Sequence, residues 1–201
     1  MLAVINYGMG NLRSVLNALA ALGADARVVD TAAELGDAEK IILPGVGAFG
    51  DGMANLRRAH LAAAIIGHAK TGKPLLGICL GMQLLASEST EHGQHAGLDL
   101  IPGSVERIAP GHGLRVPHVG WNSIKVIQPS PLLDDLEAEP TFYFLHSYHL
   151  IPAQGQASVA TVDYGERLVA CVQRANVFGA QFHPEKSQRD GLRVLKNFLS
   201  I

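Results

Sequence analysis

The run of residues 73–85 restricts the fold of this chain more than any other stretch. Pro74 to Ile78 is a short apolar segment, which predicts a buried strand, and a helical pattern begins at Gly81. Cys79 stands at the junction, and with Gly77 and Gly81 it forms a G-x-C-x-G pattern. This pattern is the sulfur counterpart of the G-x-S-x-G nucleophile elbow, in which a sharp turn joins a strand directly to a helix. The chain is therefore expected to have an α/β fold with Cys79 at the end of a strand.

Two interpretations of Cys79 are open. In the first, the sulfur faces the N-terminus of the following helix, where unpaired N–H groups and the helix dipole favour a thiolate. The amide of Leu80 is then placed to donate into an oxyanion hole. In the second, Cys79 is a small buried core residue, as many free cysteines are. A base elsewhere in the chain would decide for the first interpretation.

Strands and helices alternate through the first half of the sequence. Strands are predicted at Leu2–Ile5, Asp25–Val29 and Lys40–Leu43, and helices at 12–22 and Met53–Ala69. Asn11 is expected to cap the first helix and Gly23 to end it. Alternation of this kind favours a largely parallel sheet, whose carboxyl edge carries the active site. The loops 6–11 and 44–47 and Cys79 should therefore meet at that edge.

Two glycine-containing loops follow the first and third strands. Gly8 and Gly10 fit the start of a dinucleotide-binding fingerprint, but Arg13 replaces its third glycine, so a dinucleotide site is rejected. The loop 44–47, Pro-Gly-Val-Gly, is either a simple strand-ending turn or a segment that turns N–H groups toward a developing negative charge. Beside a nucleophile elbow, the second interpretation would complete an oxyanion hole.

Short β segments replace the helical pattern in the second half. They are predicted at Gly103–Ile108, His118–Val126, Phe142–Leu145, Ala157–Val162, Leu168–Gln173 and Val177–Phe182, before a helix over 192–199. The expected fold is a single α/β domain, residues 1–201, with a central, largely parallel mixed sheet flanked by helices. An added antiparallel β portion is expected in the second half.

Charge and cysteine content exclude several classes of protein. With 16 Lys and Arg against 18 Asp and Glu, the net charge is −2, so nothing favours binding to nucleic acid or to an anionic membrane. Cys79 and Cys171 form neither a disulfide framework nor a zinc pattern, and Cys171 is predicted to be an inert core residue. Because neither a signal peptide nor a membrane-spanning run is recognised, a cytoplasmic protein is expected.

Histidines and the single tryptophan of the middle region have unremarkable expected roles. His92, His95, His112 and His118 lack the spacing of metal ligands, so they are expected to be solvated loop residues. Neither a metal nor a cofactor is predicted. Trp121 is expected to be either a core residue or an interface anchor.

The best candidate for a base is His183, which follows the last apolar strand and precedes Pro184. Glu185 can orient its imidazole, because side chains at i and i+2 share a face in an extended chain. His146 and His149 are the rival bases, but neither has a neighbouring carboxylate. A cysteine, a histidine and a glutamate in this relation predict acyl transfer through a thioester.

Several motifs carry a family resemblance. The runs G-I-C-L-G-M-Q at 77–83 and F-H-P-E at 182–185 together resemble the class I glutamine amidotransferases. More narrowly, Asn6–Leu12, Pro44–Met53, Gly120–Asn122 and His183–Ser187 resemble the glutaminase subunits of imidazole glycerol phosphate synthases, which serve histidine biosynthesis. The likeness extends over essentially the whole chain.

This resemblance implies hydrolysis of glutamine to glutamate and ammonia. Cys79 is then the nucleophile, His183 the base and Glu185 the group that orients it. Val46, Gly47 and Leu80 form the oxyanion hole, and Gly45, Gln83, Glu91, Ser147 and Tyr148 bind the substrate. Glu91 suits this role, because an acidic side chain can pair with the α-ammonium group of glutamine.

The resemblance also implies a heterodimer with a (βα)₈-barrel cyclase subunit. The cyclase receives the ammonia and makes imidazole glycerol phosphate and aminoimidazole carboxamide ribotide. Asn11, Trp121, Tyr143 and Lys186 match positions that face this subunit; otherwise they are ordinary surface or core residues. We also hypothesise that a peptide in the 44–47 loop turns to switch the glutaminase on when the cyclase binds its own substrate.

Two alternatives stay open at this point. The chain could be the glutaminase subunit of another synthase, such as those of anthranilate, carbamoyl phosphate or pyridoxal phosphate synthesis. It could also be a non-catalytic interaction protein that carries an elbow cysteine.

Overall fold

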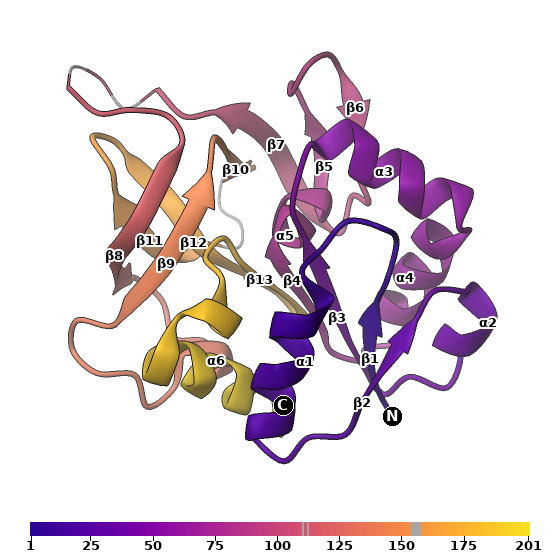
Figure 1. Cartoon of the computed structure of the whole chain (residues 1–201). Helices are drawn as coiled ribbons and strands as arrows, with labels where there is room; N and C mark the ends of the chain where they lie inside the picture. The colour runs from indigo at the N-terminus through magenta and orange to yellow at the C-terminus, as the bar shows by residue number, and fades with distance from the viewer. Residues whose placement is uncertain (110, 112, 154–157) are drawn as a thin grey trace.

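The structure, a computed structural model, describes residues 1–109, 111, 113–153 and 158–201 (Figure 1). A mixed sheet of nine strands, in the order β2-β1-β3-β4-β13-β12-β11-β8-β9, runs through the molecule, and a second sheet has the order β10-β7-β5-β6. The strands are β1 (Leu2–Ile5), β2 (Ala26–Val29), β3 (Lys40–Gly45), β4 (Leu75–Cys79), β5 (Ala86–Ser89), β6 (His95–Ala96), β7 (Ile101–Arg107), β8 (His118–Val126), β9 (Thr141–His146), β10 (Tyr148–Pro152), β11 (Ser158–Asp163), β12 (Arg167–Arg174) and β13 (Val177–Ala180). The helices are α1 (Leu12–Ala21), α2 (Ala32–Leu35), α3 (Phe49–Arg58), α4 (Leu61–Lys70), α5 (Leu80–Leu84) and α6 (Gln188–Ser200), with 3-10 turns at Pro131–Leu133 and Pro184–Lys186.

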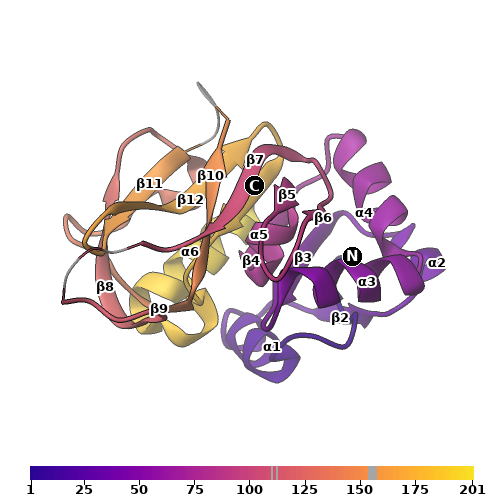
Figure 2. The same cartoon turned by 90° about the horizontal axis from the view of Figure 1, so that it is seen from above.

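The parallel half of the large sheet ends at Cys79. Strand β1 lies between β2 and β3, and β4 lies between β3 and β13, all in parallel register. Apolar residues fill consecutive positions of these strands because helices cover both faces. Ile41 and Leu43 pack into a core with α3, α4 and α5, whereas Ile42 packs into a second core with α1 and α6. Figures 1 and 2 show these two groups of helices on opposite faces of the parallel strands.

Antiparallel strands extend the sheet beyond β13. Strand β12 pairs with β13, and β11, β8 and β9 follow in antiparallel register. Figure 2 shows this portion beside the helix-flanked half. The predicted α/β fold, with a parallel centre and an antiparallel addition, is confirmed. The second sheet was not predicted from the sequence.

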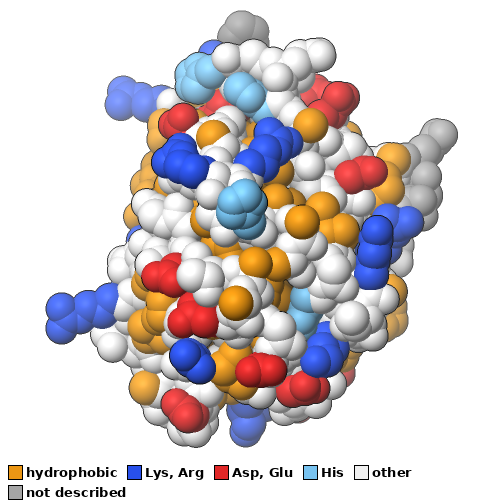
Figure 3. Space-filling view, turned by 90° about the vertical axis from the view of Figure 1, so that its right-hand side faces the viewer, with side chains coloured by type: hydrophobic (Ala, Val, Ile, Leu, Met, Phe, Trp, Pro, Cys, Tyr) orange, Lys and Arg blue, Asp and Glu red, His pale blue; other side chains and the backbone are white. Residues whose placement is uncertain are grey.

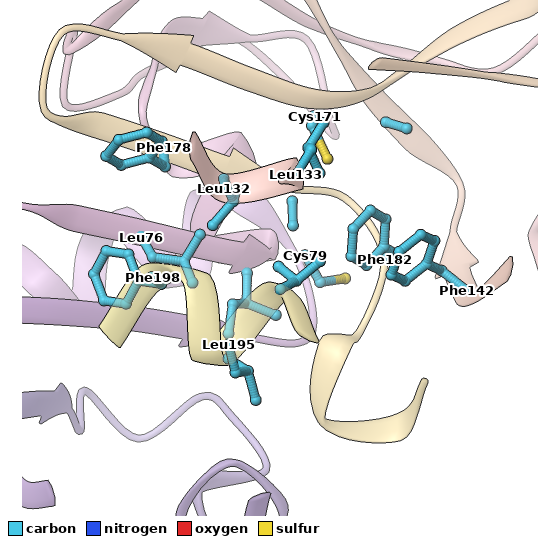
Figure 4. Packing of buried hydrophobic residues seen from close by; sticks show 14 of the residues in the cluster. Leu76, Cys79, Leu132, Leu133, Phe142, Cys171, Phe178, Phe182, Leu195 and Phe198 are labelled. Atoms are coloured by element: carbon cyan, nitrogen blue, oxygen red, sulfur yellow. The ribbon is translucent and has the colours of Figure 1, made fainter. Parts of the chain in front are cut away.

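A cluster of aromatic side chains lies between the large sheet and α6. The rings of Phe142 and Phe182 stack with their centroids 3.9 Å apart, and Phe178 meets Phe198 at 6.4 Å in an edge-to-face arrangement. Cys79 belongs to the same buried cluster and lies beside the stacked pair (Figure 4). The packing of α6 thus ties the chain near residue 183 to the strand that ends at Cys79.

Two predicted boundaries are wrong. The helix predicted over 53–69 is two helices, α3 and α4, because His60 adopts a left-handed φ of 57° that interrupts the helical backbone. Strand β3 continues through Pro44 and Gly45, so only Val46 and Gly47 of the predicted loop lie beyond the strand. Pairing of Gly45 with Cys79 in the parallel ladder extends it.

The remaining differences are small. The sequence analysis missed α2, although Thr31 and Glu34 form a capping box at its start, with the Glu34 N–H donating to the Thr31 hydroxyl at 3.4 Å. The last predicted strand ends at Ala180 rather than at residue 182. Ala157, where a strand was predicted to begin, lies outside the described residues, and the remainder of that strand is β11. The other predicted strands and helices are confirmed with slightly shifted ends, and Asn11 caps α1 as predicted, accepting from the Ser14 N–H.

The surface carries charges of both signs. On the face with α2, α3 and α4, acidic and basic side chains are interspersed with apolar ones (Figure 3). This distribution agrees with the small net charge of −2. In the described parts of the chain, no helix is long and apolar enough to span a membrane.

Candidate active site

The turn between β4 and α5 places Cys79 as the elbow motif predicts. Cys79 has φ 54° and ψ −112°, a backbone conformation that L-residues rarely adopt. A Cβ atom on Gly77 would lie 2.6 Å from the Gly81 carbonyl oxygen, and one on Gly81 would collide with the Leu43 carbonyl of the neighbouring strand. Both glycines are therefore needed for the strand and the helix to approach each other closely. The Cys79 side chain is almost fully buried, at 5% exposure.

His183 and Glu185 form a buried pair next to this turn. Nδ1 of His183 lies 2.8 Å from Oε1 of Glu185, and both side chains are at most 3% exposed. The two residues were predicted to lie together because an extended chain would place their side chains on one face. The pairing is present, but the predicted extended backbone is wrong. The backbone is extended at His183 only, and a 3-10 turn begins at Pro184 and carries Glu185 back toward the imidazole. Strand β13 pairs with β4, which brings this segment to the carboxyl end at which Cys79 lies.

Two opposing effects set the pKa of His183. Burial lowers it, but the interactions with Cys79 and with Glu185 outweigh burial and raise the pKa to about 9. Because part of this rise comes from the interaction with Cys79, the charged imidazole is favoured as the partner of a thiolate. Within the described residues, Nε2 of His183 is buried and makes no hydrogen bond of regular geometry, although Cys79 is near enough to raise the pKa of the ring.

The sulfur of Cys79 makes two other contacts. It lies 3.8 Å from the carbonyl oxygen of Leu145, to which the thiol can donate, and 3.8 Å from Nε2 of Gln181, which donates to the sulfur. The thiol thus has an acceptor in the Leu145 carbonyl, and the nucleophile also interacts with His183, since Cys79 contributes to the raised pKa of the imidazole.

The rival base His146 is committed to another network. Its Nδ1 lies 2.9 Å from the carbonyl oxygen of Tyr148, so Nδ1 carries the proton, and Nε2 must accept from Nδ1 of His118 at 3.0 Å. His118 Nε2 in turn accepts from the Asn122 amide at 3.3 Å. Burial lowers the pKa of His146 to about 3 and that of His118 to about 4. Burial therefore favours the neutral form of both rings, and both ring nitrogens of His146 are already hydrogen-bonded, so neither histidine is placed to take the thiol proton.

Two of the histidines that were expected to be solvated loop residues lie in strands instead, the half-buried His95 in β6 and His118 in β8. His118 was expected in a solvated loop, but it is 2% exposed in β8, because β8 and β9 pair and bring its ring between Phe144 and Tyr164. His149 is also buried. His112 lies outside the described residues. Within the described ranges, no three His, Cys, Asp or Glu side chains are grouped to hold a metal ion.

A cavity of about 230 Å³ opens beside the sulfur. Its walls come from the elbow, from the end of β3, from the β5–β6 turn and from β9 and β10. The lining residues are Val46, Gly47, Cys79, Leu80, Gln83, Glu91, Pro117, Leu145, His146, Ser147 and Tyr148. Seven of the eight residues predicted for the oxyanion hole and the substrate are in this wall.

Gly45 is the predicted residue that does not line the cavity. A Cβ at this position would meet the Tyr7 hydroxyl and lie 2.9 Å from Cβ of Leu80. Gly45 therefore allows β3 to pack against the elbow from behind. The Tyr7 hydroxyl is buried there and has no hydrogen-bond partner within the described residues.

The whole sequence matches one family. The family model described as "Glutamine amidotransferase class-I" covers residues 3–201. The chain belongs to the class I glutamine amidotransferases. Cys171, the other free cysteine of this amidotransferase, is fully buried in β12, and burial raises the pKa of its thiol, which agrees with the predicted inert role.

Curated relatives agree with this assignment, and solved structures share the fold. The chain is 51% identical to "Imidazole glycerol phosphate synthase subunit HisH" of Moorella thermoacetica, over 98% of this chain and 93% of that protein. It is 49% identical to the protein of the same name from Methanothermobacter thermautotrophicus, over 100% and 98% of the two chains. Two structures share the fold: "Crystal structure of glutamine amidotransferase" (TM-score 0.78, 22% identity, 98% and 97% covered) and "Structure of PurLQS from Thermotoga maritima" (TM-score 0.77, 24% identity, 99% and 97% covered).

Polar groups in the wall of this amidotransferase site are fixed by hydrogen bonds. Oε2 of Glu91 accepts from the backbone N–H of Phe49, the first residue of α3, at 2.7 Å. Nε2 of Gln83 donates to the carbonyl oxygen of Tyr148 at 2.8 Å and to Oε1 of Gln181 at 3.1 Å. The cavity thus presents a carboxylate at one end and an ordered amide network near the nucleophile.

Three of the four predicted interface residues form one cluster at the surface, in which Trp121 is exposed and Tyr143 and Lys186 are half-buried. Trp121 is 50% exposed, so it is not a core residue, and its ring meets that of Tyr143 at 6.2 Å. Nζ of Lys186 lies 5.7 Å from the centre of the Tyr143 ring. Asn11 is exposed at the start of α1 and caps that helix. The backbone of Tyr143 is bonded to the base segment, because its carbonyl accepts from the His183 N–H at 2.9 Å.

Three residues at the site were not predicted from the sequence: Pro117, Leu145 and Gln181. Pro117 and Leu145 line the cavity but have no chemical motif of their own, and His146, considered only as a rival base, lines it as well. Gln181 is fully buried and touches the sulfur. Its only signal in the sequence is a polar side chain between Ala180 and Phe182, at the end of an apolar strand.

Proposed function

We propose that this chain is the glutaminase subunit of an imidazole glycerol phosphate synthase in histidine biosynthesis. It hydrolyses glutamine to glutamate and passes the ammonia to a (βα)₈-barrel cyclase subunit. The observation that carries the proposal is near 50% identity, over almost the entire length, to relatives named as subunits of this synthase. The whole chain, residues 1–201, is taken as one amidotransferase domain. Two free cysteines support a cytoplasmic location.

In the proposed mechanism, Cys79 attacks the side-chain amide of glutamine. Nε2 of His183, the ring nitrogen that is not bonded to Glu185, takes the thiol proton as the sulfur–carbon bond forms. The tetrahedral intermediate collapses with loss of the C–N bond, and His183 returns the proton to the leaving ammonia. Water then attacks the glutamyl thioester, with His183 as base. Glutamate leaves, and the sulfur recovers its proton.

Glu185 orients the base in this scheme and stabilises the positive charge that the imidazole gains when it takes the proton. Its hydrogen bond to Nδ1 at 2.8 Å leaves Nε2 to face the sulfur. The same contact contributes to the raised pKa of His183. An imidazolium formed by proton transfer is therefore stabilised where it is needed.

The oxyanion hole is proposed to consist of Val46, Gly47 and Leu80, which line the cavity on the side of the elbow. Gly47 has φ 106°, a conformation that glycine adopts without strain, and a Cβ there would lie 2.7 Å from Cε of Met9, so the peptide between Val46 and Gly47 has no side chain on its Gly47 side. This supports the hypothesis that a peptide of this segment turns during activation. Gly45 shapes the segment from behind.

Substrate binding is assigned to the polar wall of the cavity. The Glu91 carboxylate can pair with the α-ammonium group of glutamine, and the Ser147 and Tyr148 backbone can hold its carboxylate. Gln83 lies between these groups and the nucleophile. The 230 Å³ volume suits a small amino-acid substrate.

The cluster of Trp121, Tyr143 and Lys186 is the proposed cyclase-binding surface. Val119 and Leu145, which are 52% and 40% exposed, add apolar area to the same β8–β9 pair. Aromatic side chains of this kind anchor protein interfaces. Asn11 is assigned to the edge of this surface.

Release of glutamate from glutamine tests the proposal. The protein is assayed alone, and then with a cyclase subunit and its phosphoribosyl substrate, with Cys79→Ala as the control. A large rise with the liganded cyclase, abolished by Cys79→Ala, is the expected result. Rapid hydrolysis by the isolated chain would preserve the glutaminase and remove the switch. Absence of hydrolysis with the liganded cyclase would overturn the proposed function.

A further inference from the structure

Gln181 is a buried polar residue that contacts the nucleophile. It follows β13 and precedes His183 by two residues, and its side chain is fully buried. Its Nε2 lies 3.8 Å from the Cys79 sulfur, within the range of a hydrogen bond to sulfur. The predicted triad does not include it.

Hydrogen bonding fixes the orientation of the Gln181 amide. The carbonyl oxygen of Tyr148 can only accept, so the group of Gln83 that lies 2.8 Å from it must be the NH₂ group. The same NH₂ group lies 3.1 Å from Gln181, so the Gln181 atom facing it must be the oxygen. The Gln181 NH₂ group is then left facing the sulfur. The orientation of the Gln181 amide is thus set by the Tyr148 carbonyl, which acts through the Gln83 side chain.

The two contacts of the sulfur serve different protonation states. The Leu145 carbonyl can accept only from the thiol, whereas the Gln181 N–H can donate to a thiolate. Hydrogen bonds to a charged partner are about twice as strong as neutral ones. Loss of the proton therefore weakens the contact with Leu145 and strengthens the contact with Gln181.

We propose that Gln181 stabilises the Cys79 thiolate by a direct N–H···S hydrogen bond, and that Gln83 is the positioning residue that holds the Gln181 amide in the donating orientation. The inference rests on the proposed function, because it concerns the nucleophile of the same site. Gln83 then has two roles, since it also lines the cavity. A ligand that touches Gln83 is connected to the sulfur through two hydrogen bonds.

Other titratable groups surround the sulfur and must be held constant in a test. His183 and Glu185 approach it from the segment after β13, and Tyr7 from the loop after β1. His146 on β9 and Glu91 in the β5–β6 turn line the cavity. Because variants of Gln181 keep all five groups, the difference between the wild type and Gln181→Met reports the amide, and Gln181→Glu places one carboxylate where the amide was.

The test is the pH dependence of Cys79 alkylation by iodoacetamide, measured on the full chain. Gln181→Met removes the donor at similar size, and Gln181→Glu keeps the oxygen that accepts from Gln83 but replaces the donor with an acceptor. We expect the midpoint of alkylation to rise by about one pH unit in Gln181→Met and further in Gln181→Glu. Cys79→Ala measures any reaction of Cys171.

Gln173→Met is the matched control. This glutamine lies on β12, its side chain donates at the surface to the Ala175 carbonyl at 3.3 Å, and it is not part of the cavity lining. Its midpoint should equal that of the wild type. Glutaminase kcat/KM of Gln181→Met, measured with the liganded cyclase, should fall about tenfold at pH 7 and recover at higher pH. A defect in packing alone would not recover with pH.

Gln83→Met tests the positioning step separately. It frees the Gln181 amide to rotate, so the midpoint should rise by less than in Gln181→Met. An unchanged midpoint in folded Gln181→Met, checked by circular dichroism, overturns the proposal. If neither Gln181 variant folds, an unchanged midpoint in Gln83→Met overturns it. If the wild type has no glutaminase activity, the proposed function is rejected. The alkylation midpoints then still decide whether Gln181 stabilises the thiolate.

Discussion

The carbonyl oxygen of Leu145 lies 3.8 Å from the sulfur of Cys79 and is the acceptor for its thiol. Leu145 belongs to β9, and its own side chain is 40% exposed on the surface that carries Tyr143. The next-but-one residue of this strand, Tyr143, is bonded through its carbonyl to the N–H of His183. One strand therefore contacts both the nucleophile and the base segment from behind, while its other side is available to a partner. A small displacement of β9 would change both contacts together.

Because the exposed side of β9 is available to a partner, Trp121→Ala is expected to weaken binding of the cyclase. Trp121 pairs with Tyr143 across β8 and β9 and is half-exposed, so its removal should weaken cyclase binding about 30-fold or more without unfolding the chain. Val126→Ala on the same strand, with 43% exposure, is the control and should bind normally. Calorimetric titration with the cyclase measures both. Equal dissociation constants for the two variants would place the interface elsewhere.

Gly81→Ala should destabilise the chain strongly. The added Cβ would collide with the Leu43 carbonyl, a backbone group that cannot move aside. We expect a loss of about 3 kcal/mol in the free energy of unfolding, measured with urea. Gly67→Ala is the matched change, because Gly67 is exposed in α4 with nothing within 4 Å of its added Cβ. That variant should gain about 0.5–1 kcal/mol, and similar losses in both would refute the steric argument.

Glu185→Gln should lower the pKa of His183 from about 9, because the carboxylate contributes to that rise. The amide can also donate to Nδ1 and select the wrong tautomer, so glutaminase kcat with the liganded cyclase should fall about 10²–10⁴-fold. Nuclear magnetic resonance of the imidazole and glutamate release measure the two effects. A variant with full activity would contradict the assigned role.

The same pair makes stability depend on pH. The pKa of His183 is raised above its unfolded value of 6.5, so its stabilising contribution is complete below about pH 6.5 and is lost as the pH rises through about 9. The wild type should therefore have a larger free energy of unfolding than Glu185→Gln. This difference should be greatest near pH 6 and should become smaller as the pH rises toward 9. Urea denaturation at several pH values tests this. A difference that widens with pH would reverse the assigned sign.

The His118–His146 pair should make the chain less stable as the pH falls, whereas His183 makes it less stable as the pH rises. Both pKa values, about 4 and about 3, lie below the unfolded value, so the unfolded chain binds protons first as the pH falls. Stability should decline from about pH 6.5 downward, and the two rings should not titrate above pH 5. Resonances of the ring protons, followed from pH 8 to pH 5, measure this. A midpoint above pH 6 for either ring would show that it is not held neutral.

The elbow could be predicted because its signal is local. Two glycines around Cys79 fix the turn through contacts within a few residues and with the adjacent β3. The pairing of His183 with Glu185 was also predicted, but the 3-10 turn that produces it was not, since Pro184 is compatible with either backbone.

Residues positioned by long-range pairing escaped the sequence analysis. Gln181 meets Gln83 and Cys79 only because β13 lies beside β4, and nothing near Gln181 in the sequence marks that contact. His118 was placed in a solvated loop, because its burial depends on the pairing of β8 with β9. Sequence patterns describe a residue's neighbours along the chain, whereas these two sites are made by neighbours across the sheet.

The position of β13 between β4 and β12 has a consequence for biosynthesis. During translation, β4 emerges from the ribosome long before β13. Until β13 has been made, one edge of the apolar strand β4 has no strand to pair with. Such an edge is prone to aggregation, and pairing across so many residues is slow. It follows that Cys79 acquires its base only when residues 177–185 have been made and docked. A nascent chain that stalls before this point would carry the thiol without the group that activates it.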